Sequence, residues 1–479
     1  MKLYNTLSRK IEEFVPINSP YVGLYACGVT VYDYVHLGHL RKYTMDDVLI
    51  RVLRHAGYQV EFVQNITDVG HLASDADTGE DKLEKGAKKY GQTVWDIAKK
   101  FEDYFFYSMD LMNNLRPDVS CRATEHIKEQ LQMVLELEKK GFTYEIKGDG
   151  IYFDTSKLPD YGKLARLKLD QQKEGVRVET KGKRNPSDFA LWKFERENEN
   201  RAMSWPSPWA EKSFPGWHIE CSAMAMKYLG NQFDIHTGGI DHIPVHHTNE
   251  IAQAEAATGK KPFVKHWVHH NFLRVNSEKM SKSLGNFFTI DDVLERGFEP
   301  MALRLLFLMT HYRSEMNFTW EALEGAQKAY DKLITHISNL KDTAQSSKID
   351  QLSVEALRLQ NEFCEAMDND LATPESLATM WEVVEAKNLE PAEKLQLLFD
   401  FDQVLGLDLE EAGMRKKEED EVKLTSEVQE LLDQRQAARE ARDYELADSL
   451  RSQIEVLGFT IEDHKKQQII SAVPRGVRR

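Results

Sequence analysis

The chain contains few cysteines, no long apolar run and no excess of positive charge. Four cysteines in 479 residues are too few for the disulfide framework of a secreted domain. The longest apolar candidate, Leu303–Met309, is interrupted by Arg304 and is much too short to cross a membrane. The N-terminus, MKLYNTLSRKIEEF, lacks the uninterrupted apolar segment of a signal peptide. These absences predict a cytoplasmic protein that has no membrane partner.

The charge balance is acidic, with a formal net charge of −16. Such a chain does not bind nucleic acid indiscriminately, so any contact with a nucleic acid must use local basic patches. Hydrophobic residues make up 41% and charged residues 29% of the chain, which is typical of a globular protein. Because 479 residues exceed what one core usually supports, we expect three or more domains.

The chain is organised around the stretch YACGVTVYDYVHLGH at residues 25–39. The apolar run Tyr21–Ala26 before its turn predicts a strand, and apolar residues from 48 to 56 recur at helical spacing. Val60–Gln64 predicts the next strand. The pattern is therefore a βαβ unit, with its first turn at the carboxyl end of a parallel sheet, where open α/β sheets bind ligands.

The side chains at this edge suit a phosphate ligand. Gly38 lets a ligand approach the backbone, while His36 and His39 can donate hydrogen bonds to phosphate at the helix N-terminus. Thr67 and Asp68 follow the next strand and face the same crevice, although Asp68 also fits simple turn chemistry. The alternative interpretation is a surface loop with two incidental histidines.

Metal-ligating residue types recur far apart along the chain. His246 and Glu250 are four residues apart on a predicted helix, so they share one helix face. With Cys27 and Cys221 they would make a four-ligand zinc set. The spacing matches no compact zinc motif, however, and two small buried cysteines without a metal are the alternative.

A second phosphate-binding candidate is the string KMSKS at residues 279–283. Its lysines, Lys279 and Lys282, lie three residues apart in a loop of small residues that includes Ser281. Two such charges can fold over a triphosphate, one on each side of the reacting phosphorus. A flexible basic loop is the alternative, although a five-residue string is far more specific than the two histidines.

Together, HLGH and KMSKS resemble, in that order, the two signature motifs of class I aminoacyl-tRNA synthetases. The flanking strings narrow the resemblance to the cysteinyl-tRNA synthetase family: YACGVTVYDYVHLGH, NITDVG, KRNPSDFALWK, GWHIECSAM, DIHTGG, PVHHTNEIAQ, EKMSKSLGNF and MDNDLATPESLATMWE. The resemblance runs from about residue 3 to about residue 460.

The resemblance implies an enzyme of protein biosynthesis that ligates L-cysteine to its tRNA, with ATP, through a cysteinyl-adenylate. It implies one Zn²⁺ per chain, which selects the substrate thiolate, and Mg²⁺ with ATP. The partners would be L-cysteine, ATP and cysteine tRNA, and we expect a monomer. The implied fold is an α/β Rossmann-like parallel-sheet core with an inserted connective domain, followed by a mainly helical tRNA-binding region.

Family positions carry over residue by residue. The implied catalytic residues are His36, His39, Lys279 and Lys282. The implied ATP-binding residues are these four together with Gly38 and Ser281. The implied cysteine-pocket residues are Thr67, Trp217, His236 and Asp241. The implied zinc ligands are Cys27, Cys221, His246 and Glu250, in contrast to the spacing argument.

We expect six segments along the chain: the first half of the Rossmann-like catalytic domain at 1–120, a connective insertion at 121–204, the second half of the catalytic domain at 205–275, a KMSKS and stem-contact region at 276–320, a helical bundle at 321–409, and an anticodon-recognition unit at 410–479. The insertion carries a basic stretch from Arg166 to Arg184, which either contacts a polyanion or forms a solvent-facing hairpin. The segment Glu410–Val422 is interpreted as a charged linker. We assign no chemical role to the alternating charges of residues 75–89.

The chain departs from the family pattern in four places. Val29 replaces a usual proline, His39 a usual asparagine, and Thr237 interrupts a glycine triplet; the tail from His464 matches poorly.

Three alternatives to this function remain. A cysteine ligase for an amino sugar would lack the helical residues 320–479. A catalytically inactive paralogue would not need both signatures and all four ligands. Another class I synthetase could use the zinc purely as a structural clip.

Overall fold

The computed structural model describes residues 1–70, 81–167, 182–196, 201–343, 351–420, 426–441, 443–464 and 467–472. Its centre is a five-stranded parallel sheet with the strand order β11-β10-β3-β4-β5. In that order the strands span Val264–His270, Phe233–Gly239, Tyr21–Thr30, Gln59–Thr67 and Val119–Arg122. The α/β Rossmann-like class predicted from the sequence is confirmed, and the βαβ unit consists of β3, α1 (Leu37–His55) and β4.

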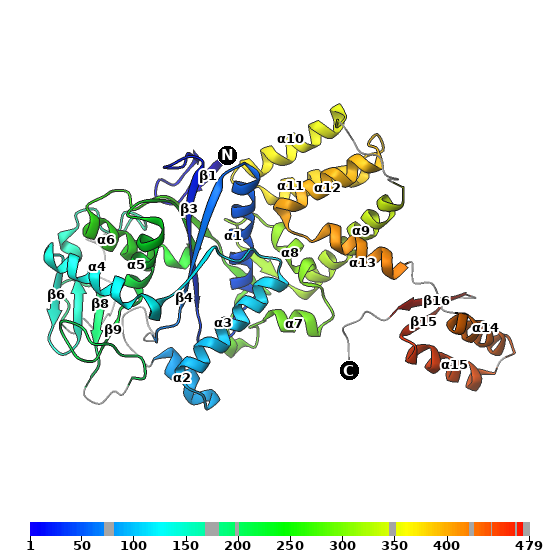
Figure 1. The fold of residues 1–479 in the computed structure, drawn as a ribbon, viewed down its shortest axis with the longest axis horizontal. Helices are drawn as coiled ribbons and strands as arrows, with labels where there is room; N and C mark the ends of the chain where they lie inside the picture. The colour runs from blue at the N-terminus through cyan, green and yellow to red at the C-terminus, as the bar shows by residue number, and fades with distance from the viewer. Residues whose placement is uncertain are drawn as a thin grey trace.

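The sheet is covered on both faces, and strand β3 shows how its residues are shared between them. Leu24 and Ala26 belong to the core on the side of α1 and α3 (Val94–Leu111). The alternate residues Tyr25 and Cys27 belong to a second core, built with α4 (Ile127–Lys139), α5 (Trp217–Leu229) and α6 (His246–Thr258). Figure 1 shows these two helical layers on opposite sides of β3 and β4. Strand periodicity thus directs Cys27 toward α5 and α6.

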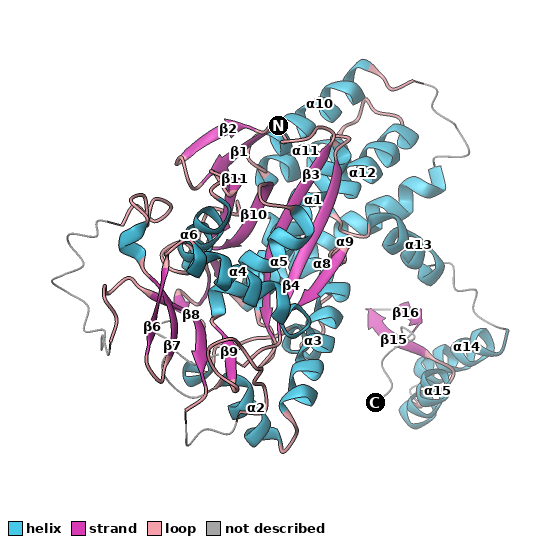
Figure 2. Ribbon diagram, turned by 60° about the vertical axis from the view of Figure 1, so that its left-hand side comes forward, coloured by secondary structure: helices cyan, strands magenta, loops and turns pink. Residues whose placement is uncertain are grey.

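Three strands of a four-stranded antiparallel sheet with the order β6-β7-β8-β9 belong to the expected insertion (Figure 2). Its strands span Thr143–Ile146, Gly150–Phe153, Phe189–Phe194 and Ser213–Pro215. β5 still belongs to the central sheet, and β9 lies beyond the expected boundary at residue 204. Most of the basic stretch, residues 168–181, lies outside the described residues, as do residues 71–80 of the alternating-charge segment, which is followed by α2 (Lys82–Tyr90).

The chain begins with the hairpin β1–β2 (Lys2–Asn5 and Lys10–Glu13). Two residues after β11 the chain forms the short strand β12 (Leu273–Val275). β12 pairs with β13 (Glu278–Lys279) and β14 (Met316–Phe318), and α7 (Ile290–Glu295) and α8 (Pro300–Leu308) lie between β13 and β14 in the chain.

Two buried arginines tie helix α1 to its surroundings. Arg41 donates to the backbone carbonyl oxygens of four residues in the loops after β11 and α8: Asn271, Phe272, His311 and Ser314. Arg304, whose charge interrupts an apolar run in the sequence, is fully buried on α8. It forms an ion pair with Asp47 of α1 and donates to the carbonyl oxygen of Leu405 at 2.6 Å. An arginine in an apolar stretch here joins the sheet domain to the helices that follow.

The helical bundle consists of α9 to α13, which span Trp320–Thr343, Val354–Asp368, Thr373–Glu385, Pro391–Leu405 and Leu409–Asp420. The interpretation of Glu410–Val422 as a linker is wrong over most of its length, because α13 lies there and Leu409 and Ala412 are buried in the main core. Glu410, Glu411 and Arg415 are exposed on this helix, whereas Leu409 and Ala412 pack in the core.

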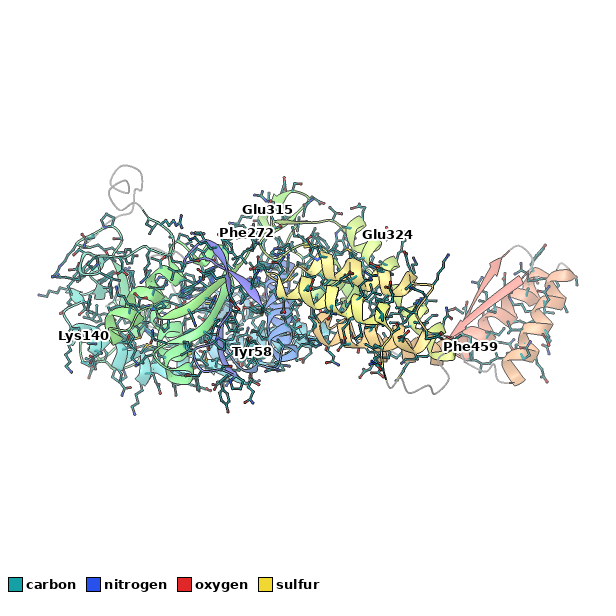
Figure 3. The ribbon with its side chains drawn as sticks, turned by 90° about the horizontal axis from the view of Figure 1, so that it is seen from above. Tyr58, Lys140, Phe272, Glu315, Glu324 and Phe459 are labelled. Carbon is teal, nitrogen blue, oxygen red and sulfur yellow. The ribbon has the colours of Figure 1, made fainter. Side chains whose placement is uncertain are left out.

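The C-terminal unit contains α14 (Ser426–Glu440), α15 (Tyr444–Val456), and the antiparallel pair β15 (Phe459–His464) and β16 (Gln467–Ala472). The expectation of helix to the end of the chain is therefore wrong for this hairpin, and the tail beyond 472 lies outside the described residues. Figure 3 shows the parts in a row, from the insertion near Lys140 through the bundle near Glu324 to the unit of Phe459. Among the described residues, no helix combines the length and apolarity that crossing a bilayer requires.

Candidate metal and nucleotide site

The carboxyl end of β3 carries a break in its hydrogen-bonding register between Ala26 and Val29. The break places Cys27 and Gly28 outside the regular pairing with β4. The N–H of Gly28 is satisfied instead by the side-chain oxygen of Asn65, at 2.8 Å. A Cβ atom at position 28 would lie 1.6 Å from the carbonyl oxygen of Asn65, so the close approach of the two strands requires glycine here.

Four buried ligand atoms converge behind this break. Cys27 comes from β3, Cys221 from α5, and His246 and Glu250 from consecutive turns of α6; all their ligand atoms lie within 4.8 Å of one another. Nε2 of His246 lies 3.0 Å from Oε1 of Glu250, and Sγ of Cys27 lies 3.9 Å from the same oxygen. The residues that the sequence suggests as a zinc set are thus brought together from three separate segments.

The electrostatics of this cluster suit a divalent cation. The hydrogen bond with Cys27 and burial raise the pKa of the Cys221 thiol, and burial raises that of Cys27. Although burial acts to lower it, Glu250 and Cys221 raise the pKa of His246 to about 10. Although burial acts to raise it, His236 and His246 lower the pKa of Glu250, so its carboxylate is ionised. The two thiols and the imidazole of this buried cluster therefore hold protons that a metal ion would displace on binding.

Histidines that sequence reasoning missed surround this cluster. Nδ1 of His218 lies 2.9 Å from Nδ1 of His246, which leaves Nε2 of His246 facing Glu250. Nε2 of His247 lies 3.2 Å from Sγ of Cys27, and Nδ1 of His247 lies 2.7 Å from Nε2 of His269. A second group of potential ligands shares two members with the first: Cys27, His236, His247 and Glu250. One signal was available in the sequence, because eight of the sixteen histidines fall between residues 218 and 270.

Two of the expected pocket residues contact the metal-ligand cluster directly. Nε2 of His236 donates to Oε2 of Glu250 at 3.0 Å, and the His236 ring stacks on Trp267 with centroids 4.7 Å apart. The ring of Trp217 lies 4.6 Å from that of His246. An aromatic wall and a hydrogen-bonded histidine therefore adjoin the four potential ligands.

The other expected pocket residues lie at the edge of the sheet. Thr67 is buried at the end of β4, where its hydroxyl accepts a hydrogen bond from the amide of Asn65 at 3.0 Å. Asp241 is exposed just after β10. Asp68 closes the neighbouring turn, because its carboxylate accepts from the N–H of Thr124 at 2.9 Å; burial raises its pKa to about 6.

The N-terminus of α1 carries the residues that the sequence predicts to bind phosphate. His36 is the N-cap of the helix, and its Nδ1 accepts hydrogen bonds from the N–H groups of Gly38 and His39. The rings of His36 and His39 stack with centroids 3.7 Å apart. Burial lowers the pKa of His36 to about 4 and that of His39 well below its ordinary value. Both imidazoles are therefore neutral at pH 7 and would act as hydrogen-bond donors rather than as cations.

The KMSKS loop reaches this helix end through three contacts. Lys282 forms an ion pair with Asp33, Phe287 packs edge-on to the ring of His36 at 5.1 Å, and the N–H of Leu37 donates to the carbonyl oxygen of Phe288 at 2.9 Å. Within the loop, the N–H of Ser281 donates to the side-chain oxygen of Asn286 at 2.7 Å, while Lys279 lies on the exposed strand β13. The structure thus places the two signatures side by side.

Comparison with family models yields two matches. Residues 13–328 match the class I (C) tRNA synthetase catalytic domain, and residues 421–470 match the anticodon-binding domain of cysteinyl-tRNA ligase. The second match begins immediately after α13, so it coincides with the C-terminal unit.

Comparison with individual proteins yields near full-length matches. The cysteine–tRNA ligase of Treponema denticola is 43% identical over 483 residues, covering 97% of this chain and 98% of that protein. The cysteine–tRNA ligase of Thermus thermophilus is 43% identical over 475 residues, with the same shares covered. Among solved structures, methionyl-tRNA synthetase of Mycobacterium tuberculosis, in complex with methionyl-adenylate, is similar with a TM-score of 0.55. The match covers 83% of this chain and 92% of the methionyl-tRNA synthetase chain at 15% identity, which shows that the two share a fold.

Proposed function

The chain belongs to the cysteinyl-tRNA synthetase family, and from that premise we propose how its site activates cysteine. The chain is an enzyme that joins cysteine to tRNA. The finer proposal is that cysteine first becomes a cysteinyl-adenylate, with its thiol held at the cluster of Cys27, Cys221, His246 and Glu250. The convergence of these four ligands beside the stacked histidines of α1 carries the proposal.

The donor set fits zinc. Two sulfur atoms, one imidazole nitrogen and one carboxylate oxygen are ligands that Zn²⁺ accepts, and all four are buried. His218 would orient the ring of His246, and His236 would orient the carboxylate of Glu250 through the hydrogen bonds described above. When bound, the ion would supply an acceptor for the substrate sulfur as thiolate.

The chain's other residues position the reacting groups. The carboxylate oxygen of cysteine attacks the α-phosphorus of ATP, and the bond from this phosphorus to the oxygen between the α- and β-phosphates breaks. Pyrophosphate leaves, and Mg²⁺ bound with ATP would neutralise its charge. A hydroxyl of the terminal tRNA ribose then attacks the adenylate carbonyl and releases AMP. The neutral imidazoles of His36 and His39 would donate to phosphate oxygens on one side. Lys279 and Lys282 would neutralise charge on the other side.

Selectivity against serine is the property that a zinc site explains best. Serine differs from cysteine by one atom, so an apolar pocket alone could reject it by only about tenfold to a few hundredfold. Thiols ionise readily and sulfur is the softer ligand, whereas a hydroxyl is a far weaker acid. Next to the aromatic wall of Trp217 and the buried cluster, the hydroxyl of serine would therefore find no interaction that matches the one between the metal and the thiolate of cysteine.

The test combines metal analysis with pyrophosphate exchange. We expect purified, zinc-supplemented protein to hold one zinc per chain and to catalyse ATP–pyrophosphate exchange with cysteine but not with serine. Cobalt-substituted protein should show a thiolate charge-transfer band that changes when cysteine is added. Efficient serine activation, or a cobalt spectrum indifferent to cysteine, would contradict the proposed role of the metal.

The tRNA would bind along the bundle and the C-terminal unit. A truncation after Asp420 keeps α13, which packs in the main core, and removes only the unit matched by the anticodon-binding domain. We expect the truncated chain to keep pyrophosphate exchange and to lose most of its transfer to tRNA. Equal loss of both activities would mean that this unit supports the catalytic fold. An amino-sugar ligase would have no use for the unit, so the loss of transfer also excludes that alternative.

A further inference from the structure

The carbonyl oxygen of Cys27 is bound by a lysine. At the break in β3, where Cys27 lies outside the regular strand pairing, this oxygen accepts a hydrogen bond from Nζ of Lys42 at 2.7 Å. Lys42 lies on α1, one turn after His39, and its side chain is only 12% exposed. On the same peptide group, the side-chain oxygen of Asn65 accepts a hydrogen bond from the N–H of Gly28. Two side chains thus replace the strand pairing that the break removes.

Lys42 is itself held by a chain of buried groups. Its Nζ lies 2.7 Å from Oδ2 of Asp46, four residues later on α1. Oδ1 of Asp46 accepts a hydrogen bond from Nε2 of His270 at 2.8 Å. The side chains of Asp46 and His270 are 2% and 3% exposed. Because His270 ends strand β11, the chain of contacts connects the far edge of the sheet with the ligand-bearing turn of β3.

Burying such charged groups lowers the stability of the fold unless every charge has a partner. Burying an aspartate and a lysine costs several kcal/mol per ion in desolvation, and a hydrophobic pair is often as stable. Here Lys42 forms an ion pair with Asp46, His270 donates to Asp46, and Lys42 also donates to the backbone oxygen of a metal-ligand candidate, Cys27. Fixed geometry at that oxygen is what a purely apolar contact between α1 and β3 would not provide, because apolar packing is not directional.

We propose that Lys42 is a positioning residue that, supported by Asp46 and His270, fixes the Cys27 peptide so that its thiolate points at the zinc. This inference rests on the proposed function, in which Cys27 is a zinc ligand. Groups that orient a ligand typically contribute a factor of about 10 to 100 in metal affinity. Lys42 would thus position a metal ligand, whereas His36 and His39 on the same helix would bind phosphate.

The same helix offers a matched control. Arg51 pairs with Asp47 at 2.8 Å, again four residues apart on α1, and it also donates to a backbone carbonyl oxygen, that of Asn113 at 2.8 Å. This second ion pair therefore has the same spacing and a similar carbonyl contact, but the contact is at the end of α3 rather than at Cys27. Lys42→Met and Arg51→Met each remove an ion pair within α1 and a contact with a carbonyl oxygen; Arg51→Met also removes a second carbonyl contact, with Gln403 at 3.3 Å.

The experiment measures zinc affinity by competition with a chelator on the full-length protein, together with the spectrum of the cobalt form. We expect Lys42→Met to weaken zinc binding by about 10- to 100-fold and to alter the cobalt–thiolate band. Arg51→Met should lower the melting temperature and leave zinc affinity within about twofold of the wild type. Asp46→Asn should weaken zinc binding in the same direction by a smaller factor, and it serves as the test if Lys42→Met does not fold.

Two outcomes overturn the inference. If Lys42→Met keeps the zinc affinity and cobalt spectrum of the wild type, Lys42 does not position Cys27. If Arg51→Met loses zinc to the same extent, both residues act through the stability of α1 alone. Failure of the proposed function gives a different result, because the wild-type protein itself would then bind no zinc.

Discussion

The two ends of the proposed active site differ in how completely they are built. At the metal end, Cys27, Cys221, His246 and Glu250 are all buried, and hydrogen bonds from neighbouring histidines orient His246 and Glu250. At the nucleotide end, the side chain of Lys282 is 48% exposed and its ammonium is paired with Asp33. In the proposed site the metal end is thus organised before any substrate arrives, whereas we expect a ligand to complete the nucleotide end.

The chemistry of the two substrates accounts for this difference. Telling a thiol from a hydroxyl depends on ligand softness and acidity at one point, which requires fixed groups and the exclusion of water. A triphosphate brings several charges and its own Mg²⁺, so mobile lysines can follow it as the charge redistributes. Four predictions test the contrast, from the largest expected effect to the smallest.

The largest effect should come from Cys27→Ala. Because the metal end is preorganised around its ligands, we expect the variant to lose most of its zinc and to reduce cysteine-dependent exchange by more than the roughly 100-fold cost of an orienting group. Metal analysis and the exchange assay measure this. Cys121→Ala removes another buried thiol, on β5, and should keep its zinc. Unchanged zinc in Cys27→Ala would remove that residue from the site.

Lys282→Ala should affect the opposite end. We expect adenylate formation to fall by about a hundredfold, on the order of 3 kcal/mol, because the ammonium acts where negative charge develops. Zinc content and the KM for cysteine should not change. Lys99→Ala, which removes an exposed ammonium on α3, is the control. A variant that loses zinc as well would show that the two ends are not independent.

Asp33→Asn tests whether the nucleotide end is completed only when its ligand binds. The carboxylate of Asp33 competes with ATP for Lys282, and partly exposed ion pairs contribute about 0.2–1 kcal/mol. Removing it should therefore lower the KM for ATP by up to about fivefold, with little change in kcat. A higher KM for ATP would assign Asp33 a role in binding the nucleotide or its metal.

The smallest effect should be a pH dependence of stability from the stacked histidines. Burial lowers the pKa of His36 to about 4 and that of His39 well below its usual value. The unfolded chain takes up these protons near pH 6.5, so the folded state should lose stability as the pH falls below 6.5, by about 1 kcal/mol per histidine at pH 5.5. Denaturant unfolding at pH 7.5 and 5.5 measures this, and the double variant His36→Asn, His39→Asn should show a smaller loss. An equal loss in the variant would assign the dependence to other groups.

The sequence predicted the parts of this site that depend on local patterns. Strand, turn and helix around HLGH follow from apolar periodicity, and the structure confirms them as β3, α1 and β4. The spacing of Cys27, Cys221, His246 and Glu250 carried little information, because their proximity comes from the sheet order, in which β10 lies beside β3 across a long stretch of sequence. Residue types offered that set as one of two alternatives, and the family resemblance favoured it.

Other features could not be predicted because they depend on contacts between distant segments. Glu410–Val422 has the composition of a linker, yet the few apolar residues of α13 complete the core of the bundle. The histidines around the cluster, such as His218 and His269, are unremarkable one by one and acquire their role through partners from other elements. Lys42 is similar, since its partner at Cys27 is an oxygen of the backbone.

Helix α1 also limits how this enzyme can be redesigned. Its first turn lies at the proposed nucleotide end, Arg41 binds four carbonyl oxygens of the loops after β11 and α8, and Lys42 reaches the carbonyl oxygen of Cys27. A chimera that imports another amino-acid pocket would change the residues of α5 and α6 but would inherit an α1 that fixes the backbone at position 27. Pocket and helix therefore form one exchangeable module, and successful transplants between synthetases should need crossover points on either side of both.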